Sequence, residues 1–351
     1  AADQAEDNLT MSLNVPEIKE CEGSLQFGSH SLDPGESASN SFEVENIGNT
    51  EWTVTANAQA QDGHDISGWV SFDSPKSKML GEPGSSDDSH TFTFDVTPDD
   101  SLEAGTQIAI NIQGRAGTNV GCEKVLTVTV GQEFGATMSL SKTTLSNVEP
   151  GTSGTLSIQI TNQGNGQDSF SIGHSAVPSG WSVTLSETSV SLQGKHASQS
   201  ERQISIDITV FVPTDALADE DVTITLSVSS SGSSSATASD ELDVSVAERH
   251  ALLGNVLSVD QTGRSGEDIK FPVTVSNDGN VQDSFRLRAC DPSQPSSCAS
   301  PSWPSRYVDS TGQVIETISL NAGESQEVFL EIEISSEDEG DYLQVEVRVN
   351  I

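Results

Sequence analysis

Residues 32–55 read LDPGESASNSFEVENIGNTEWTVT, and the chain returns to this pattern twice. VEPGTSGTLSIQITNQGNGQDSFSI follows from residue 148, and GRSGEDIKFPVTVSNDGNVQDSFRL from residue 263. The turn glycines that align the copies are Gly35, Gly151 and Gly266. Their spacing gives periods of 151−35=116 and 266−151=115 residues, which predicts three tandem domains.

Each copy continues with alternating apolar and polar residues, then an Asn and Gly turn, then a second alternating run. The apolar positions of the first runs are Phe42 and Val44; Leu156, Ile158 and Ile160; Phe271, Val273 and Val275. A period of two indicates a strand with one face in a core, and the turn between two such runs indicates a hairpin. Without a helical pattern, such units favour immunoglobulin-like β-sandwiches over an eight-stranded up-and-down barrel.

The turns and core positions also carry a family resemblance. The Pro-Gly turn, the N-x-G-N turn, the PSGW stretch at 178–181 and an acidic turn before the penultimate strand are similar to immunoglobulin-like repeats of bacterial and archaeal surface proteins, the alpha-galactosidase-associated and cell-adhesion-related domains. Residues 134–248 match best. Trp69 is the equivalent of Trp181, whereas the third copy has a Cys-containing insert before Trp303. The resemblance implies an extracellular, cell-surface setting and says little about a ligand.

We therefore divide the chain into four parts. Residues 1–20 form an N-terminal extension, 21–132 the first domain, 133–248 the second, and 249–351 a third domain that is incomplete.

The net charge of the chain limits the classes of partner that it can bind. Lys and Arg number 15 against 53 Asp and Glu, a formal net charge of −38, which excludes nucleic acid and anionic membranes as ordinary electrostatic partners. Solubility in a salty environment explains this charge, and bound calcium is the rival interpretation. Its candidate ligands are Asp99, Asp100 and Glu103; Asp219, Glu220 and Asp221; Glu337, Asp338, Glu339 and Asp341. No stretch has the Asp-x-Asp-x-Asp-Gly spacing of a local calcium loop, so we expect no cofactor and leave structural calcium open.

The four cysteines predict two disulfides and an oxidising compartment. Cys21 and Cys122 flank the first repeat, and Cys290 and Cys298 share the insert of the third, so we pair them in this way. Zinc is disfavoured because no Cys-x-x-Cys occurs.

The start of the chain is consistent with secretion. Ala1-Ala2-Asp3 resembles the mature end left by signal cleavage, although a boundary within a longer chain would look the same. No transmembrane stretch is present, so direct membrane insertion is not expected. Asn8 lies in an N-glycosylation sequon.

Catalysis is not expected. The histidines are scattered without His-Glu-x-x-His, and no serine lies in a Gly-x-Ser-x-Gly elbow. The tryptophans are interpreted as core residues, with an aromatic sugar-binding platform as the alternative.

The last repeat lacks its closing strand. The first and second copies end in apolar strands at Val125–Val130 and Leu242–Val246. In the third, Leu343, Val345, Val347 and Val349 alternate as a penultimate strand, and the sequence stops at Ile351. A sandwich without this strand would expose an unpaired edge and an apolar groove.

The N-terminal extension has a surplus strand. Thr10–Leu13 repeats Thr137–Leu140, the opening strand of the second copy, but lies 34−13=21 residues before the Pro of the turn instead of 150−140=10. The extra residues contain Cys21 and a second strand candidate, Leu25–Phe27. The side chains that alternate as an inserted strand requires are Leu9, Met11, Leu13 and Val15.

These two features suggest a polymer. The N-terminal strand of one copy would fill the open edge of the third domain of the next, giving a head-to-tail filament whose partner is the chain itself. This resembles donor-strand-complemented surface filaments of archaea and bacteria. The alternatives are a stalk or adhesion segment of a larger surface protein, in which Thr10–Leu13 is the ordinary first strand, and a glycan-binding module; other surface proteins or glycans are the partners these imply.

Overall fold

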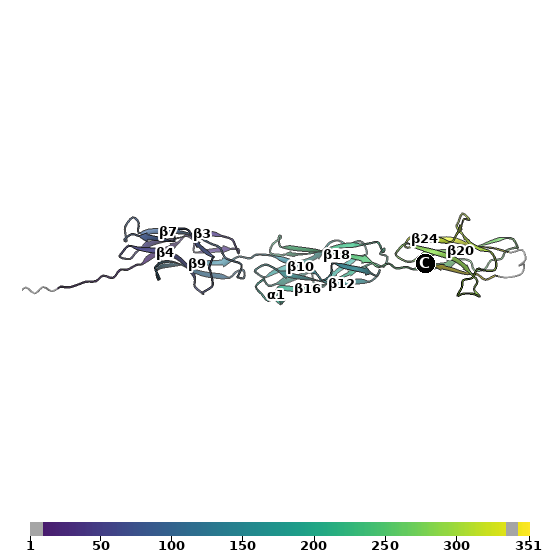
Figure 1. Cartoon of the computed structure of the whole chain (residues 1–351), viewed down its shortest axis with the longest axis horizontal. Helices are drawn as coiled ribbons and strands as arrows, with labels where there is room; N and C mark the ends of the chain where they lie inside the picture. Colours follow the sequence, from purple (N-terminus) through teal and green to yellow (C-terminus); the bar gives the residue numbers. More distant parts are fainter. Residues whose placement is uncertain (1–9, 335–342) are drawn as a thin grey trace, which may run out of the picture.

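The computed structural model describes residues 10–334 and 343–351. Strands make up three β-sandwiches that follow one another in a row, and residues 10–20 leave the first as an extended tail (Figure 1). One short helix occurs in the described part, α1 (Gln199–Arg202). No helix there is long and apolar enough to cross a membrane. The predicted fold of three tandem immunoglobulin-like sandwiches is confirmed.

The first sandwich pairs a four-stranded sheet, ordered β1-β3-β7-β5, with a five-stranded sheet, ordered β2-β9-β8-β4-β6. Its strands are β1 (Cys21–Leu25), β2 (Ser29–Leu32), β3 (Ala38–Asn46), β4 (Trp52–Ala60), β5 (Val70–Phe72), β6 (Ser77–Leu80), β7 (Ser89–Val96), β8 (Gln107–Ala116) and β9 (Asn119–Val130).

The second sandwich repeats this plan, with sheets ordered β10-β12-β16-β14 and β11-β18-β17-β13-β15. Its strands are β10 (Ala136–Leu140), β11 (Thr144–Val148), β12 (Ser153–Asn162), β13 (Asp168–His174), β14 (Ser182–Leu185), β15 (Ser189–Leu192), β16 (Gln203–Phe211), β17 (Val222–Ser230) and β18 (Thr237–Val246).

The third sandwich differs in its second sheet, which has the order β24-β21-β26 and faces a sheet ordered β19-β20-β25-β22-β23. Its strands are β19 (Leu252–Val256), β20 (Asp268–Asn277), β21 (Asp283–Cys290), β22 (Ser305–Val308), β23 (Val314–Ile315), β24 (Thr317–Leu320), β25 (Ser325–Glu333) and β26 (Glu346–Asn350).

Alternation along the strands places the cores where the sequence predicts them. Phe42 and Val44 on β3, and Ile158 and Ile160 on β12, are fully buried, with polar neighbours turned outward. The predicted core role of the tryptophans also holds, since Trp52, Trp69 and Trp181 are buried. Trp303 is half-buried against the third core.

The closing strands β9 and β18 lie inside their sheets. Each is antiparallel to the penultimate strand, β8 or β17, and parallel to a short strand near the start of its domain, β2 or β11. In the described part of the third domain β26 pairs with β21 and has no second neighbour.

Two strand positions differ from those read off the sequence. The opening strand of the first sandwich is Cys21–Leu25, so the strand candidate Leu25–Phe27 was placed too late, and Thr10–Leu13 is not the first strand that the stalk alternative requires. In β1, Cys21 lies opposite Asn46, which matches Ala136 opposite Asn162 in the second sandwich. Residues 10–13 and 137–140 therefore share the sequence TMSL but do not occupy equivalent positions in their domains. The penultimate strand of the third domain starts at Glu346, so Leu343 and Val345 precede it.

Candidate interface for assembly

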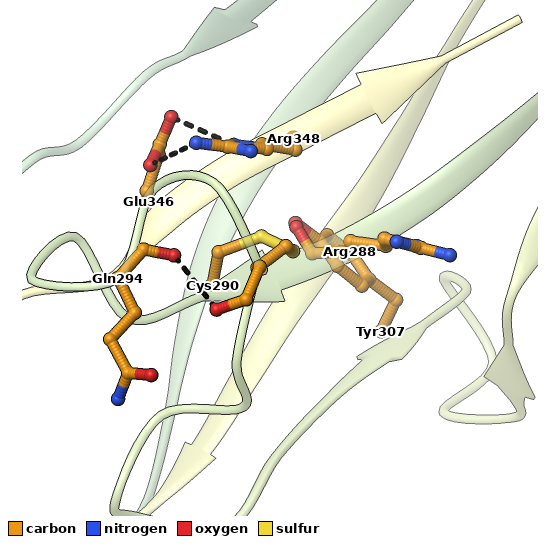
Figure 2. Close-up of a disulfide and its surroundings, with 8 residues drawn as sticks. Arg288, Cys290, Gln294, Tyr307, Glu346 and Arg348 are labelled. Carbon is orange, nitrogen blue, oxygen red and sulfur yellow. Dashed lines mark hydrogen bonds and ion pairs between the residues drawn. A yellow bond between two sulfur atoms is a disulfide. The ribbon is translucent and has the colours of Figure 1, made fainter.

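Both predicted disulfides are present. Cys21–Cys122 joins β1 to the closing strand β9 across a separation of 101 residues. Cys290–Cys298 closes a short loop at the end of β21. In Figure 2 this loop lies beside Glu346 and Arg348 of β26, which form an ion pair with 3.0 Å between Arg348 Nε and Glu346 Oε1. Since Cys290 is the register partner of Glu346, the disulfide lies at the start of the strand that carries the open edge.

The first asparagine of each N-x-G-N turn holds its own domain together. Asn46, Asn162 and Asn277 are buried. Each side-chain amide donates to the carbonyl four residues later and to a carbonyl at the end of β6, β15 or β24, or just after it. Each Oδ1 accepts from the glycine of the turn. This repetition makes the turn rigid.

The second asparagine of the turn binds the linker that enters the domain. Asn165 Nδ2 donates to the carbonyl of Gly131 at 3.0 Å, and its Oδ1 accepts from the amide of Glu133 at 2.8 Å. Asn280 does the same with Ala247 at 2.9 Å and Arg249 at 2.6 Å. Because Gly131 and Ala247 directly follow β9 and β18, these side chains fix the point at which a closing strand becomes a linker.

Asn49 makes the same contacts with residues 16–18 of the tail. Its Nδ2 donates to the carbonyl of Pro16 at 3.1 Å, its Oδ1 accepts from the amide of Ile18 at 2.7 Å, and its backbone amide donates to Ile18 O. We call this three-residue recognition by Asn49, Asn165 or Asn280 the linker clamp.

The glycine of each turn is required by the clamp. A Cβ on Gly48 would lie 2.0 Å from the carbonyl oxygen of Ile18. On Gly164 it would lie 2.3 Å from that of Glu133, and on Gly279 2.4 Å from that of Arg249. The tail therefore approaches the first domain as closely as a true interdomain linker approaches the second and third.

The linker clamp shows which residues of the tail correspond to residues at the ends of β9 and β18. Val15 occupies the position of Val130 and Val246, directly before the clamped segment. The distance to the opening strand is the same in all three: 21−15, 136−130 and 252−246 are each 6 residues. The stretch MSLNV at 11–15 thus corresponds to the closing-strand ends LTVTV at 126–130 and LDVSV at 242–246.

The corresponding side chains differ sharply in exposure. Leu126, Val128, Leu242 and Val244 are at most 1% exposed, whereas Met11 and Leu13 are 87% and 90% exposed. The tail therefore has the sequence and register of a closing strand without a sandwich around it. Leu9, the fourth predicted donor residue, and the Asn8 sequon lie outside the described residues.

The upstream domain also touches the clamp at the two internal junctions. Ala104 and Ala218, from the acidic turns, donate backbone N–H groups to the carbonyls of Asn165 and Asn280. Lys195 additionally lies 3.0 Å from Asp100 and 3.4 Å from Glu133. Partial burial opposes its charge, but these carboxylates outweigh burial and raise the pKa of Lys195.

Within residues 10–334 and 343–351, nothing covers Asn49 in this way. It is exposed, whereas Asn165 and Asn280 are buried at 0% and 5% exposure. The first domain thus has the linker contacts of an internal junction, while its clamp asparagine is exposed instead of buried.

The edge of β26 is the second half of the candidate interface. The predicted acceptor residues Leu343, Val345, Val347 and Val349 pack on the third core but are only partly buried. Their counterparts on β17, from Val222 to Val228, are almost completely buried in a sheet where β18 pairs with β17. Residues 257–263, at the place of β2 and β11, form no strand, and Leu257 and Val259 there are 59% and 79% exposed.

One buried carboxylate of the third domain, that of Asp283, differs from its counterpart in the second domain. In the second sandwich Asp168 Oδ2 accepts from the hydroxyl of Ser230 at the end of β17. The matching Asp283 is 7% exposed, and its Oδ2 has no hydrogen-bond partner among the described residues. Its Oδ1 lies 2.8 Å from His250 Nδ1. The position of Ser230 is taken by Ile351, which has no side-chain donor.

The acidic clusters do not define a metal centre in the described part of the chain, where no group of three His, Cys, Asp or Glu side chains is placed to hold a metal ion. Asp99 instead binds Ser101, and Asp100 binds Lys195. The third cluster, Glu337 to Asp341, lies outside the described residues.

Sequence reasoning proposed a donor strand and an acceptor edge, which stay predictions, and it missed the linker clamp. The available signal was the last letter of N-x-G-N, which recurs as Asn49, Asn165 and Asn280. Its contacts reach residues 31 to 34 positions earlier in the chain. A turn motif alone does not reveal such a partner.

No protein-family model and no curated protein sequence matches the chain. Among solved structures, it is similar to extracellular cadherin domains 1–4 of protocadherin Gamma B7, with a TM-score of 0.38 and 10% identity over 95% of this chain and 75% of that one. It is also similar to domains 4 and 5 of the S-layer protein SbsC, with a TM-score of 0.22 and 16% identity over 43% and 69%. A protein of unknown function from Porphyromonas gingivalis matches with a TM-score of 0.22 and 9% identity over 64% and 99%.

Proposed function

We propose that this protein is the structural subunit of an extracellular surface filament. Copies join head to tail when the N-terminal strand of one subunit enters the open sheet of the third domain of the next. The contact is heterologous and does not close on itself, so it propagates into a fibre.

The linker clamp at Asn49 is the observation that carries the proposal. It places residues 11–15 in the register of β9 and β18, while Met11 and Leu13 lie in solvent. Two exposed apolar side chains at alternate positions of an extended segment gain free energy on entering a core, about 1.5–3 kcal/mol for each one fully buried.

The free edge of β26 in the described part of the third domain supports the other half of the proposal. A strand added between β26 and residues 257–263 would convert the sheet β24-β21-β26 into the five-stranded order of the first two domains. It would pair with the free edge of β26 and cover the partly buried valines.

The disulfides and the net charge support the extracellular location in this proposal. Two disulfides favour an oxidising, extracellular compartment, and the net charge of −38 suits a soluble surface exposed to salt. A scaffold role without catalysis or cofactor is part of the proposal.

The competing function is a stalk or adhesion segment of a larger surface protein. The clamp favours it equally if residues 11–15 close a domain that precedes them in the same polypeptide. A glycan-binding module is less well supported, because Trp52, Trp69 and Trp181 are buried and offer no open aromatic platform.

Removal of residues 1–16 tests the proposal. Electron microscopy of the intact chain should show fibres, and the shortened chain should give separate rods of three folded domains. The matched control is Ser12→Asp, which changes an outward-facing residue of the same strand and should retain fibres. Fibres formed by the shortened chain would contradict the proposal, and rods formed by the intact chain would favour the stalk.

A further inference from the structure

The internal junctions define how a closing strand is registered. In the first domain Val128 and Leu126 of β9 lie opposite Ile108 and Ile110 of β8. In the second domain Val244 and Leu242 of β18 lie opposite Val222 and Ile224 of β17. The two registers are the same once the repeats are aligned.

The same alignment extends to β26 through its pairing with β21. Leu287 lies opposite Val349, as Ile172 lies opposite Val228 in the second domain. Leu287 and Ile172 each follow their turn glycine by 21 residues, since 287−266=21 and 172−151=21. Counting back six residues, from Val228 to Val222 along β17 and from Val349 to Leu343 along β26 and the residues just before it, makes Leu343 the equivalent of Val222 and Val345 that of Ile224.

From these two correspondences we infer that the inserted strand has one register, with Leu13 of one copy opposite Leu343 of the next and Met11 opposite Val345. This inference rests on the proposed function and adds the residue pairing of the joint. The strand runs antiparallel to β26 and parallel to residues 257–263, as β18 does to β17 and β11.

Two constraints exclude neighbouring registers. A shift of one residue would turn Met11 and Leu13 to the solvent face, because side chains alternate with a period of two. A shift of two residues would keep Met11 and Leu13 on the core face. It would, however, move the clamped residues Pro16 and Ile18 by two residues relative to the strand with which the inserted strand pairs. That relative position is identical at both internal junctions, so only the stated register reproduces their geometry.

The same register also pairs outward-facing residues of the two segments. Ser12 would lie opposite Gln344, as Asp243 lies opposite Thr223 and Thr127 opposite Ala109. Ser12 and Gln344 are exposed in the subunit. They can therefore report the pairing without disturbing the apolar face.

Cysteine cross-linking tests the inference. The double variant Ser12→Cys with Gln344→Cys should give a ladder of disulfide-linked oligomers after mild oxidation, and mass spectrometry should find the peptide containing residue 12 linked to that containing residue 344. Directly opposite residues have Cβ atoms about 4.5–5.5 Å apart, close to what a disulfide needs.

The matched control is Asn14→Cys with Gln344→Cys. This pair lies on the same face but two residues out of register, where Cβ atoms are about 7–8 Å apart, so the ladder should be lost. Each single variant should form dimers at most.

The outcomes separate the register from the proposed function. Fibres that cross-link through the Asn14 pair, or through neither pair, would overturn the register while leaving the filament intact. If neither fibres nor ladders form, both the register and the proposed function fail.

Discussion

The second and third sandwiches share one repeat but differ in the last strand. In the second, β18 pairs with the edge of β17, and Val222, Ile224, Leu226 and Val228 are buried. In the third, the equivalent residues on and before β26 are only partly buried, and the described core has about half as many fully buried apolar residues. The difference shows how much of the second core depends on its closing strand, since Leu242, Val244 and Val246 of β18 are all part of that core.

The largest effect should come from placing a charge in the closing strand. Val244→Asp should destabilise the second sandwich by about 4 kcal/mol or more, because an unpaired carboxylate would replace a fully buried side chain. Leu13→Asp should change the stability of the separate subunit by less than about 0.5 kcal/mol, because Leu13 is exposed, yet abolish assembly. Denaturant unfolding followed by tryptophan fluorescence, together with sedimentation, measures both effects. An equal loss of stability in the two variants would show that the tail is already packed in the subunit.

A second experiment supplies the missing strand in trans. A peptide of residues 1–16, added to the chain that lacks these residues, should stabilise the third sandwich by about 2.7 kcal/mol at a hundredfold excess over its Kd. Thermal unfolding should show the shift in the third domain and leave the second unchanged. The control peptide carries Leu13→Asp and should have no effect. If the two peptides act alike, specific strand insertion is excluded.

The clamp asparagines allow a smaller, matched comparison. Asn165→Ala should cost about 1–3 kcal/mol, because it leaves the buried polar groups of the linker without partners. Asn49→Ala should cost less than about 1 kcal/mol in the separate subunit, because water reaches the exposed Asn49 and the tail. Hydrogen exchange at residues 18 and 133 measures each clamp. Within assembled fibres the Asn49 site should become as protected as the Asn165 site, and unchanged protection would argue against a buried joint.

Salt should have the mildest effect. Each copy carries a net charge of −38, so copies repel one another, and the screening length falls from about 10 Å at 0.1 M to about 3 Å at 1 M salt. We expect the critical concentration for assembly to fall a few-fold over this range, as measured by pelleting. Binding of the 1–16 peptide, which carries only three acidic residues, should depend on salt much less. Fibres that dissolve as salt is added would point to an interface held by ion pairs.

Much of the fold could be predicted because it rests on local patterns. Alternation at Phe42 and Val44 or Ile158 and Ile160 identifies buried strand faces, and the recurring Asn and Gly turns identify hairpins. The two disulfide pairings also followed from the positions of the cysteines in the repeats. The position of the first strand did not follow from the sequence, because TMSL at residues 10–13 copies the sequence of an opening strand.

The sequence by itself determined that the chain folds as three repeated sandwiches and that Met11, Leu13 and Val15 alternate as a spare strand would. These conclusions need only periodicity and spacing. The tertiary structure decided which strand the spare one resembles. Asn49 grips Pro16 and Ile18 as Asn165 and Asn280 grip the internal linkers, and this equivalence exists only after folding brings residues more than thirty positions apart into contact.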